Sequence, residues 1–306
     1  MLRRTMTTIL MVACAAALLT ATTVRAAGPK LNPLSEDQVK KISAAMPDKA
    51  SVKPEKPRKL LIYWGCGGFF HGGGIAAGNV AIKMLGEKTG AFEATQTTDD
   101  SACFTPENLK QFDAIYFNNT CRSKVNEQQR AAILDFVKSG KGIVGNHAAA
   151  DNFHDWPEGA AIIGATFMSH PWGMCPVKID DPSHPLVKSL GGKGYWMRDE
   201  IYAFKEPYSR EKLRVLLSMD AEKGDPKKAG RKDGDNAVMW IQQVGQGRMF
   251  YYSAGHEFAP FADPLVLRLF LDGIQYAMGD LKADATPSAK LNPQPTPILP
   301  PEKPAK

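Results

Sequence analysis

In the first half of the chain, short apolar segments alternate with segments of helical periodicity. Four segments are mostly apolar or alternate as β-strands do: 60–65, 92–98, 112–117 and 143–146. Apolar residues recur at helical spacing over 75–85, before Gly90, and again between Asn126 and Gly140, which mark the two ends of a second helix. Strands that alternate with helices predict a doubly wound, mostly parallel sheet.

The second half of the chain has a different pattern, in which strands follow one another without long helices between them. The expected strands are 177–180, 196–204, 215–219, 237–243 and 248–253. Paired glycines at 244–247 predict a hairpin turn, and Asp263 followed by Pro264 begins a final amphipathic helix. We therefore predict an α/β fold whose parallel sheet has antiparallel additions in its second half.

The first residues carry a targeting signal. Two arginines precede a short apolar run over 9–20, and a small-x-small cleavage site follows at 24–26. This run is shorter than the ~20 apolar residues of a membrane span. Residues 1–26 are therefore expected to be a cleaved signal peptide, which places the protein in the periplasm or outside the cell; Cys14 leaves a lipoprotein site as the alternative.

The remaining chain divides into a lead-in, one domain and a tail. Residues 59–280 form the α/β domain. In the lead-in 27–58, Ser35 and Gln38 have capping-box spacing and predict a short helix. The tail 281–306 is rich in proline and poor in apolar residues, so we expect it to be disordered or extended.

The net charge of +6 does not indicate nucleic-acid binding. The excess of basic residues lies in the signal, the lead-in and the tail, and residues 59–280 carry a small excess of acidic residues. Because nucleic-acid binding needs a basic surface on the folded domain, we exclude that class of partner. The sequence leaves the oligomeric state open.

Four cysteines remain after the signal, namely Cys66, Cys103, Cys121 and Cys175. Export permits disulfides. We expect Cys103 and Cys121 to form one, because each follows one of two neighbouring predicted strands. Cys66 lies in a glycine-rich turn and is the alternative candidate for a reactive thiol.

Three histidines follow predicted strands: His71, His147 and His256. Open α/β sheets bind ligands at the carboxyl ends of their strands, and imidazole suits both proton transfer and metal ligation. The turn 65–74 before His71 is rich in glycine but contains no nucleotide-binding fingerprint. We predict that the three imidazoles meet in one polar pocket, with His147 and His256 as catalytic groups and His71 binding substrate.

Further polar and aromatic residues are candidates for the same pocket. Glu200 lies in a charged stretch of a predicted strand and is the third catalytic candidate. Asp151, Trp156, His170 and Glu257 are candidate substrate-binding residues, because aromatic rings beside polar groups suit sugars. A divalent metal ion is a possible cofactor. It is left open, because zinc needs convergent histidines and carboxylates and no short metal-binding motif is present.

The chain resembles the trehalose-utilisation (ThuA-like) family over roughly residues 59–280. The resemblance is carried by the turn 65–71, the strand 112–118, GNHAA at 145–149 with Asp151 and Trp156, the stretch 164–171, DPSHP at 181–185, DEIY at 199–202 and the stretch 245–256. It implies a class I glutamine amidotransferase-like (flavodoxin-like) fold in which His147 lies near the position of the amidotransferase nucleophilic cysteine. The turn at Cys66 and the loop 222–235 depart from the family pattern.

The residues and the resemblance together predict an exported protein of disaccharide or keto-glycoside catabolism. We expect acid/base or metal-assisted chemistry on a small-molecule carbohydrate, as in a lyase, hydrolase or isomerase that processes keto-sugars. The alternatives are a non-catalytic sugar-binding protein and an interaction protein that works through its lead-in and tail.

Overall fold

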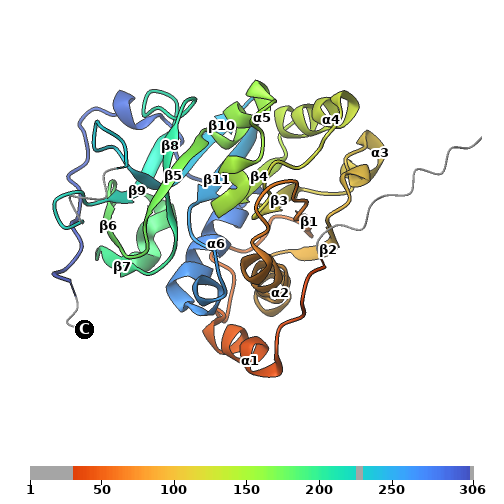
Figure 1. Ribbon diagram of the computed structural model, residues 1–306, viewed down its shortest axis with the longest axis horizontal. Helices are drawn as coiled ribbons and strands as arrows, with labels where there is room; N and C mark the ends of the chain where they lie inside the picture. Colours follow the sequence, from red (N-terminus) through yellow and green to blue (C-terminus); the bar gives the residue numbers. More distant parts are fainter. Residues whose placement is uncertain (1–29, 225–229, 304–306) are drawn as a thin grey trace, which may run out of the picture. The chain divides into compact units, whose positions relative to one another are not determined.

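A nine-stranded sheet organises the computed structural model, which describes residues 30–224 and 230–303 (Figure 1). The expected signal peptide lies outside the described residues. Five neighbouring strands are parallel, in the order β2 (Glu93–Thr98), β1 (Lys59–Tyr63), β3 (Ala114–Asn118), β4 (Gly142–Asn146) and β11 (Gly247–Tyr252). Their carboxyl ends therefore share one edge of the sheet. The first four were predicted to be parallel, whereas β11 was expected among the antiparallel additions.

The sheet continues with antiparallel strands beyond β11, again as predicted. These are β10 (Ala237–Val244), β9 (Arg214–Met219), β6 (Cys175–Ile179) and β7 (Tyr195–Met197). A separate two-stranded sheet pairs β5 (Thr166–Trp172) with β8 (Ile201–Lys205). The single strand predicted over 196–204 is wrong, since the chain leaves one sheet after Met197 and enters the other at Ile201.

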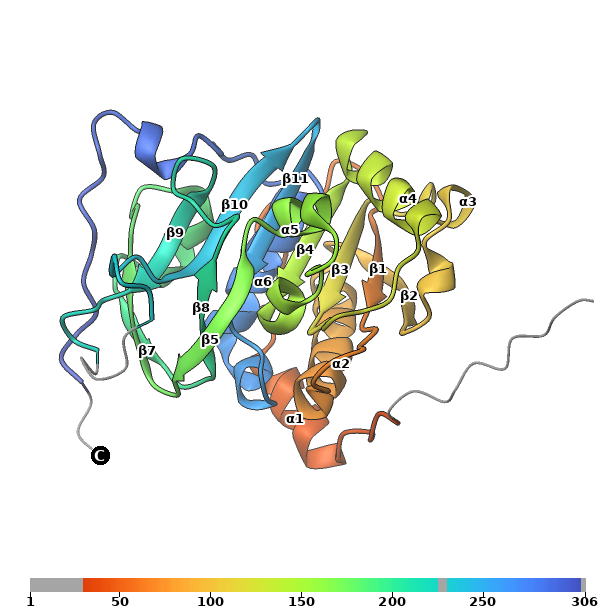
Figure 2. The same ribbon diagram turned by 45° about the horizontal axis from the view of Figure 1, so that its top comes forward.

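Helices pack on both faces of the parallel strands (Figure 2). One hydrophobic cluster contains Leu60 and Ile62 with residues of α1 (Glu36–Ala45), α2 (Gly72–Thr89) and α6 (Pro264–Ala277). The other contains Leu61 and Tyr63 with residues of α3 (Pro106–Leu109), α4 (Glu127–Lys138) and α5 (Pro157–Ile163). Alternate residues of β1 thus face opposite clusters, which explains why this strand is apolar throughout. The fold is α/β, with parallel central strands and antiparallel additions.

Five short 3₁₀ helices complete the described elements. They are η1 (Ser101–Cys103), η2 (His147–Asp151), η3 (Pro185–Leu190), η4 (Ala259–Ala262) and η5 (Ser288–Lys290). Among the described residues, no helix has the length and apolar character needed to cross a bilayer.

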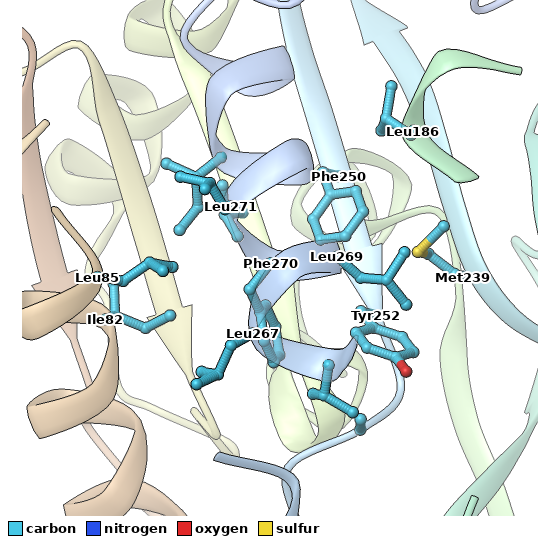
Figure 3. Packing of buried hydrophobic residues seen from close by; sticks show 14 of the residues in the cluster. Ile82, Leu85, Leu186, Met239, Phe250, Tyr252, Leu267, Leu269, Phe270 and Leu271 are labelled. Atoms are coloured by element: carbon cyan, nitrogen blue, oxygen red, sulfur yellow. The ribbon is translucent and has the colours of Figure 1, made fainter. Parts of the chain in front are cut away.

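Helix α6 fixes the position of β11 (Figure 3). Gly273 lies so close to the strand that a Cβ atom there would come within 2.3 Å of the Phe250 ring. Phe270 packs against Tyr252 and Phe261, with ring centroids 5.3 and 5.8 Å apart. Because β11 leads directly into the segment that carries His256, this packing also places that histidine.

The lead-in and the tail both pack on the domain. The predicted capping box of Ser35 and Gln38 is present at the start of α1. The described part of the tail is extended, and Ile298 exchanges backbone hydrogen bonds of 2.9 Å with Ile179. The tail is therefore not fully solvated. The short strand β7 leaves the edge of β6 at Ile179 uncovered, and the tail residue Ile298 pairs with Ile179 there.

The expected disulfide between Cys103 and Cys121 is not formed, and all four cysteines are free. The reason is the order of the strands. Cys103 follows β2 and Cys121 follows β3, but β1 lies between these two strands. The backbone neighbour of Cys121 is therefore Cys66, which follows β1.

Candidate functional site

Four side chains from distant parts of the sequence meet at the carboxyl edge of the parallel strands. Each of His71, His147, Glu200 and His256 offers a ring nitrogen or carboxylate oxygen, and these four atoms all lie within 4.8 Å of one another. We call these residues the histidine–glutamate centre. The three histidines are those that follow predicted strands, so the structure brings the expected imidazoles together.

His147 is held in a strained turn immediately after β4. Its φ of 42° is in the left-handed region, which is unusual for a residue with a Cβ atom. The carbonyl oxygen of Ser253 lies 3.2 Å from Nδ1, and the Tyr251 hydroxyl donates a 2.7 Å hydrogen bond to the carbonyl oxygen of His147. Because Nδ1 donates to a carbonyl, Nε2 carries the lone pair that faces the centre.

A buried carboxylate holds the turn that carries His256. Asp199 Oδ2 accepts hydrogen bonds from the backbone N–H groups of Gly255 (2.5 Å) and His256 (3.2 Å). Gly255 has a φ of 118°, and a Cβ there would lie 2.5 Å from the Asn146 side-chain amide. His256 Nδ1 thereby lies 3.0 Å from His147 Nε2.

Glu200 connects the centre to a further histidine. Its Oε1 lies 3.4 Å from His256 Nδ1 and 3.7 Å from His147 Nε2, whereas its Oε2 lies 3.4 Å from His170 Nδ1. Glu200 lies in the short segment between the end of β7 and the start of β8. Its backbone N–H donates a 2.9 Å hydrogen bond to Asp199 Oδ1, which holds this segment outside the strands.

His71 is the fourth residue of the centre and immediately precedes α2. The Tyr202 hydroxyl lies 3.5 Å from its Nε2, and its Nδ1 is buried without a hydrogen-bond partner. A buried polar atom without a partner is costly. Its ring centroid is 4.9 Å from that of His147 and 5.0 Å from that of His256.

Burial and neighbouring charges set the protonation states of the centre. Desolvation lowers the pKa of His147 well below its ordinary value and that of His71 to about 4, and the other imidazoles act in the same direction. The hydrogen bond with Glu200 raises the pKa of His256. Burial would raise the pKa of Glu200, but the hydrogen bond and charge of His256 outweigh it and lower that pKa. At neutral pH, His71 and His147 are thus neutral and Glu200 is ionised.

A pocket of about 360 Å³ opens onto the centre. It is lined by Phe69, His71, Arg122, Asp151, Phe167, His170, Glu200, Tyr202 and His256. The Phe69 side chain is 69% exposed at the mouth, and Phe167 stacks on His170 with centroids 5.9 Å apart. The pocket therefore combines aromatic faces with hydrogen-bonding groups, which is typical of small-ligand sites.

Asp151 lies on the wall of the pocket within a polar network. Its Oδ1 accepts a short hydrogen bond from His154 Nε2. Its Oδ2 lies 3.0 Å from the Cys121 thiol and 3.4 Å from Arg122 Nε. This network joins the segment after β4 to the segment after β3.

Two of the predicted substrate-binding residues do not line the pocket. Trp156 is buried at the start of α5, where its ring packs edge-on against Phe153 at 4.9 Å. Glu257 is exposed and follows the turn that carries His256. The other predicted residues, Asp151 and His170, do line it.

Sequence reasoning missed four residues that line the pocket: Phe69, Arg122, Phe167 and Tyr202. Phe69 lies in the glycine-rich turn, so an exposed aromatic residue between glycines was the available signal. Arg122 has a left-handed φ of 46°, for which its sequence offers no signal. His184, by contrast, does not line the pocket, and its Nε2 contacts the Asp284 carbonyl oxygen at 3.0 Å.

Comparison with known proteins identifies the family. The model of the trehalose-utilisation family, ThuA, matches residues 59–277. The chain belongs to the ThuA family. This confirms the resemblance, and the family's description places the protein in carbohydrate metabolism. None of the curated proteins compared with the chain matches it.

Solved structures of ThuA-like proteins have the same fold. A protein of Bacteroides uniformis ATCC 8492 is 26% identical, with a TM-score of 0.60 over 74% of this chain and 93% of that chain. A protein of Parabacteroides merdae ATCC 43184 is 20% identical, with a TM-score of 0.57 over 73% of this chain and 91% of that chain. Both are described as ThuA-like.

The donors of the centre fit a divalent metal ion. Three imidazoles and one carboxylate are a common ligand set for zinc. His147 donates its Nδ1–H to a backbone carbonyl, as metal-binding histidines usually do, which leaves Nε2 for the ion. His71 offers one ring nitrogen to the same cluster of ligand atoms.

Proposed function

We propose that this ThuA-family protein is an exported enzyme that acts on a carbohydrate, specifically an oxidised (keto) glycoside, at the histidine–glutamate centre. The observation that carries the proposal is the convergence of four ligand atoms within 4.8 Å at the base of a pocket with aromatic walls. Membership of a family of trehalose utilisation supports a sugar as the substrate.

His71, His147, Glu200 and His256 would hold a divalent metal ion. A bound ion supplies Lewis acidity, which favours removal of a proton next to a carbonyl group. His147 is fully buried and is not among the residues that line the pocket, so we assign it as a ligand instead of a base that touches the sugar.

His170 is the residue placed to move the proton. It lines the pocket, and Glu200 Oε2 lies 3.4 Å from its Nδ1. A histidine that a carboxylate orients in this way keeps its other ring nitrogen available as an acid or base. Glu200 thus has two functions, because its Oε1 faces the centre and its Oε2 positions His170.

The aromatic and polar walls of the pocket would bind the sugar. Phe69 and Phe167 offer rings to the C–H faces of a pyranose. Asp151 and Arg122 offer an acceptor and donors for its hydroxyl groups. This replaces the role that the sequence suggested for Trp156.

Proton exchange is the most direct test of this chemistry. The protein would be incubated in D₂O with trehalose, methyl glucosides and their keto derivatives, and NMR would follow deuterium uptake next to the carbonyl. We expect exchange only with the keto compounds. Loss of the acid/base group in His170→Ala should slow it by about 100-fold or more.

The control is His184→Gln, which changes a histidine outside the pocket and should keep full exchange. Binding of the sugars by calorimetry without exchange or product would contradict the enzyme and support the alternative of a sugar-binding protein. Export is tested separately, since N-terminal sequencing of the protein from its own cells should begin after residue 26.

A further inference from the structure

Two cysteines lie side by side next to residues that line the pocket, outside the histidine–glutamate centre. Cys66 and Cys121 are partners in a parallel β-bridge. The backbone N–H groups of Gly67 and Gly68 donate hydrogen bonds of 2.7 and 3.2 Å to the Cys121 carbonyl oxygen. A Cβ atom at Gly68 would come within 2.6 Å of Cys121 Sγ, so this sulfur lies against the turn. The turn after β1 is thus fixed beside Cys121.

The two thiols have different surroundings. The Cys66 thiol is partly exposed and donates a 3.1 Å hydrogen bond to the Phe69 carbonyl oxygen. The Cys121 thiol is buried, and its Sγ lies 3.0 Å from Asp151 Oδ2. One thiol is therefore accessible to a reagent, and the other has a carboxylate beside it that can accept a proton.

We propose that Cys66 and Cys121 form a redox-active dithiol, which exchanges with small disulfides and becomes a disulfide beside the pocket. This proposal goes beyond the proposed enzyme activity and does not depend on it. It rests on the backbone bridge between the two cysteines and on the placement of Asp151 beside Cys121.

The exchange has two balanced steps. The Cys66 thiolate attacks one sulfur of a small disulfide, which forms a mixed disulfide and releases one small thiolate. The Cys121 thiol then passes its proton to the Asp151 carboxylate and attacks Cys66 Sγ, which releases the second small thiolate. The small disulfide is reduced to two thiols while the protein dithiol is oxidised to a disulfide.

The acidities of the two thiols favour Cys66 as the attacking group. Its hydrogen bond with Cys121 lowers the pKa of Cys66 to about 7, despite partial burial. The same hydrogen bond, burial and the adjacent Asp151 raise the pKa of Cys121. An attacking thiol reacts best when its pKa is close to the ambient pH.

The disulfide would change the pocket. It would join the turn that carries Phe69 and His71 to the segment that carries Arg122. It would also remove the hydrogen bond of the Cys121 thiol to Asp151. Oxidation would therefore alter one wall of the pocket and leave its opposite wall, with Phe167 and His170, unchanged.

Mass spectrometry of the full chain tests the proposal. The reduced protein would be equilibrated with mixtures of reduced and oxidised glutathione, quenched by alkylation, weighed intact and mapped by proteolysis. We expect a loss of about 2 Da, from two thiol hydrogens, and a peptide in which Cys66 is joined to Cys121. Cys121→Ser should trap glutathione on Cys66, and Cys66→Ser should trap none.

Cys103→Ser is the matched control and should oxidise as the unaltered chain does, because Cys103 lies away from the pair. If Cys121→Ser does not fold, the peptide map of the unaltered chain and the Cys66→Ser variant decide the question. Absence of any disulfide at every glutathione ratio, or a disulfide that contains Cys103 or Cys175, would overturn the proposal.

Discussion

A methyl group added at Gly74 should displace the turn that carries His256. Gly74 lies in the first turn of α2, and a Cβ atom there would come within 2.4 Å of the Gly255 carbonyl oxygen and 2.5 Å of the His256 carbonyl oxygen. These are backbone atoms, which cannot rotate away. Helix and turn must separate by at least about 0.6 Å before the nearer contact reaches 3.0 Å, the shortest that Cβ atoms normally make.

The neighbouring Gly73 provides a matched control, because a Cβ atom at that position would meet nothing within 4 Å. Both Gly→Ala changes reduce the entropy of the unfolded chain, which stabilises the folded protein by about 0.4–1 kcal/mol. The difference between the two variants therefore isolates the steric clash. We expect Gly74→Ala to be less stable than Gly73→Ala by about 1–3 kcal/mol, the usual cost of overpacking.

The assays are guanidinium unfolding at fixed pH and calorimetric titration with Zn²⁺. Gly74→Ala should also bind Zn²⁺ about 10-fold more weakly, since sites lose function when ligands move by about 0.5 Å or more. Gly73→Ala should bind it as the unaltered chain does. Equal stability and equal Zn²⁺ affinity in the two variants would refute the claim that this contact positions His256.

Three further changes test other parts of the structure. His147→Gly should be about 1–2 kcal/mol more stable than His147→Ala in guanidinium unfolding, because only glycine accepts a φ of 42° without strain, and equal stabilities would contradict the strain. Asp181→Ala removes the buried carboxylate that pairs with the Arg214 guanidinium and leaves it the exposed Asp284 and the Thr286 carbonyl, so it should cost about 1.5–3 kcal/mol in unfolding while Zn²⁺ binding is unchanged; a loss below about 1 kcal/mol would contradict the buried pair. The rate of Cys66 alkylation should rise with pH around a midpoint near 7, and Cys121→Ala should shift this midpoint upward; a midpoint near the ordinary thiol value of about 8.5 would contradict the hydrogen bond between the thiols.

The parallel half of the fold and the meeting of the histidines could be predicted from the sequence. Strands that alternate with helices must be parallel, and parallel strands end at one edge. His147 directly follows β4, and His256 follows β11, which was expected among the antiparallel additions but pairs in parallel with β4, so the two histidines meet at the same edge. His71 joins them because the glycine-rich turn is short.

The charged stretch made Glu200 a candidate, but the interruption of the strand that positions it could not be predicted, because the segment around it has the composition of a strand. The structure breaks that strand at Asp199, whose buried carboxylate binds three backbone N–H groups instead of leaving them in a sheet. No local pattern of residues encodes that choice. Trp156 fails for the opposite reason, since a tryptophan near polar residues suits a sugar site but here fills the core beside Phe153.

The cysteine pairing and the tail depended on strand order and strand length. Cys103 and Cys121 follow strands that are adjacent in the sequence, but β1 separates these strands in the sheet. The tail is ordered around Ile298 because the short β7 leaves one side of Ile179 free, while its other side pairs with Leu217 of β9. Both facts follow from long-range contacts that composition does not report.

The central claim is that His71, His147, Glu200 and His256 bind a divalent metal ion. Its most direct test is elemental analysis of the purified protein after dialysis against Zn²⁺ and then against metal-free buffer, beside His147→Ala and the control His184→Gln. The account predicts one divalent ion per chain in the unaltered protein and in the control, and loss of that ion in His147→Ala. Retention of the same ion content by folded His147→Ala, or no bound ion in the unaltered protein, would contradict it.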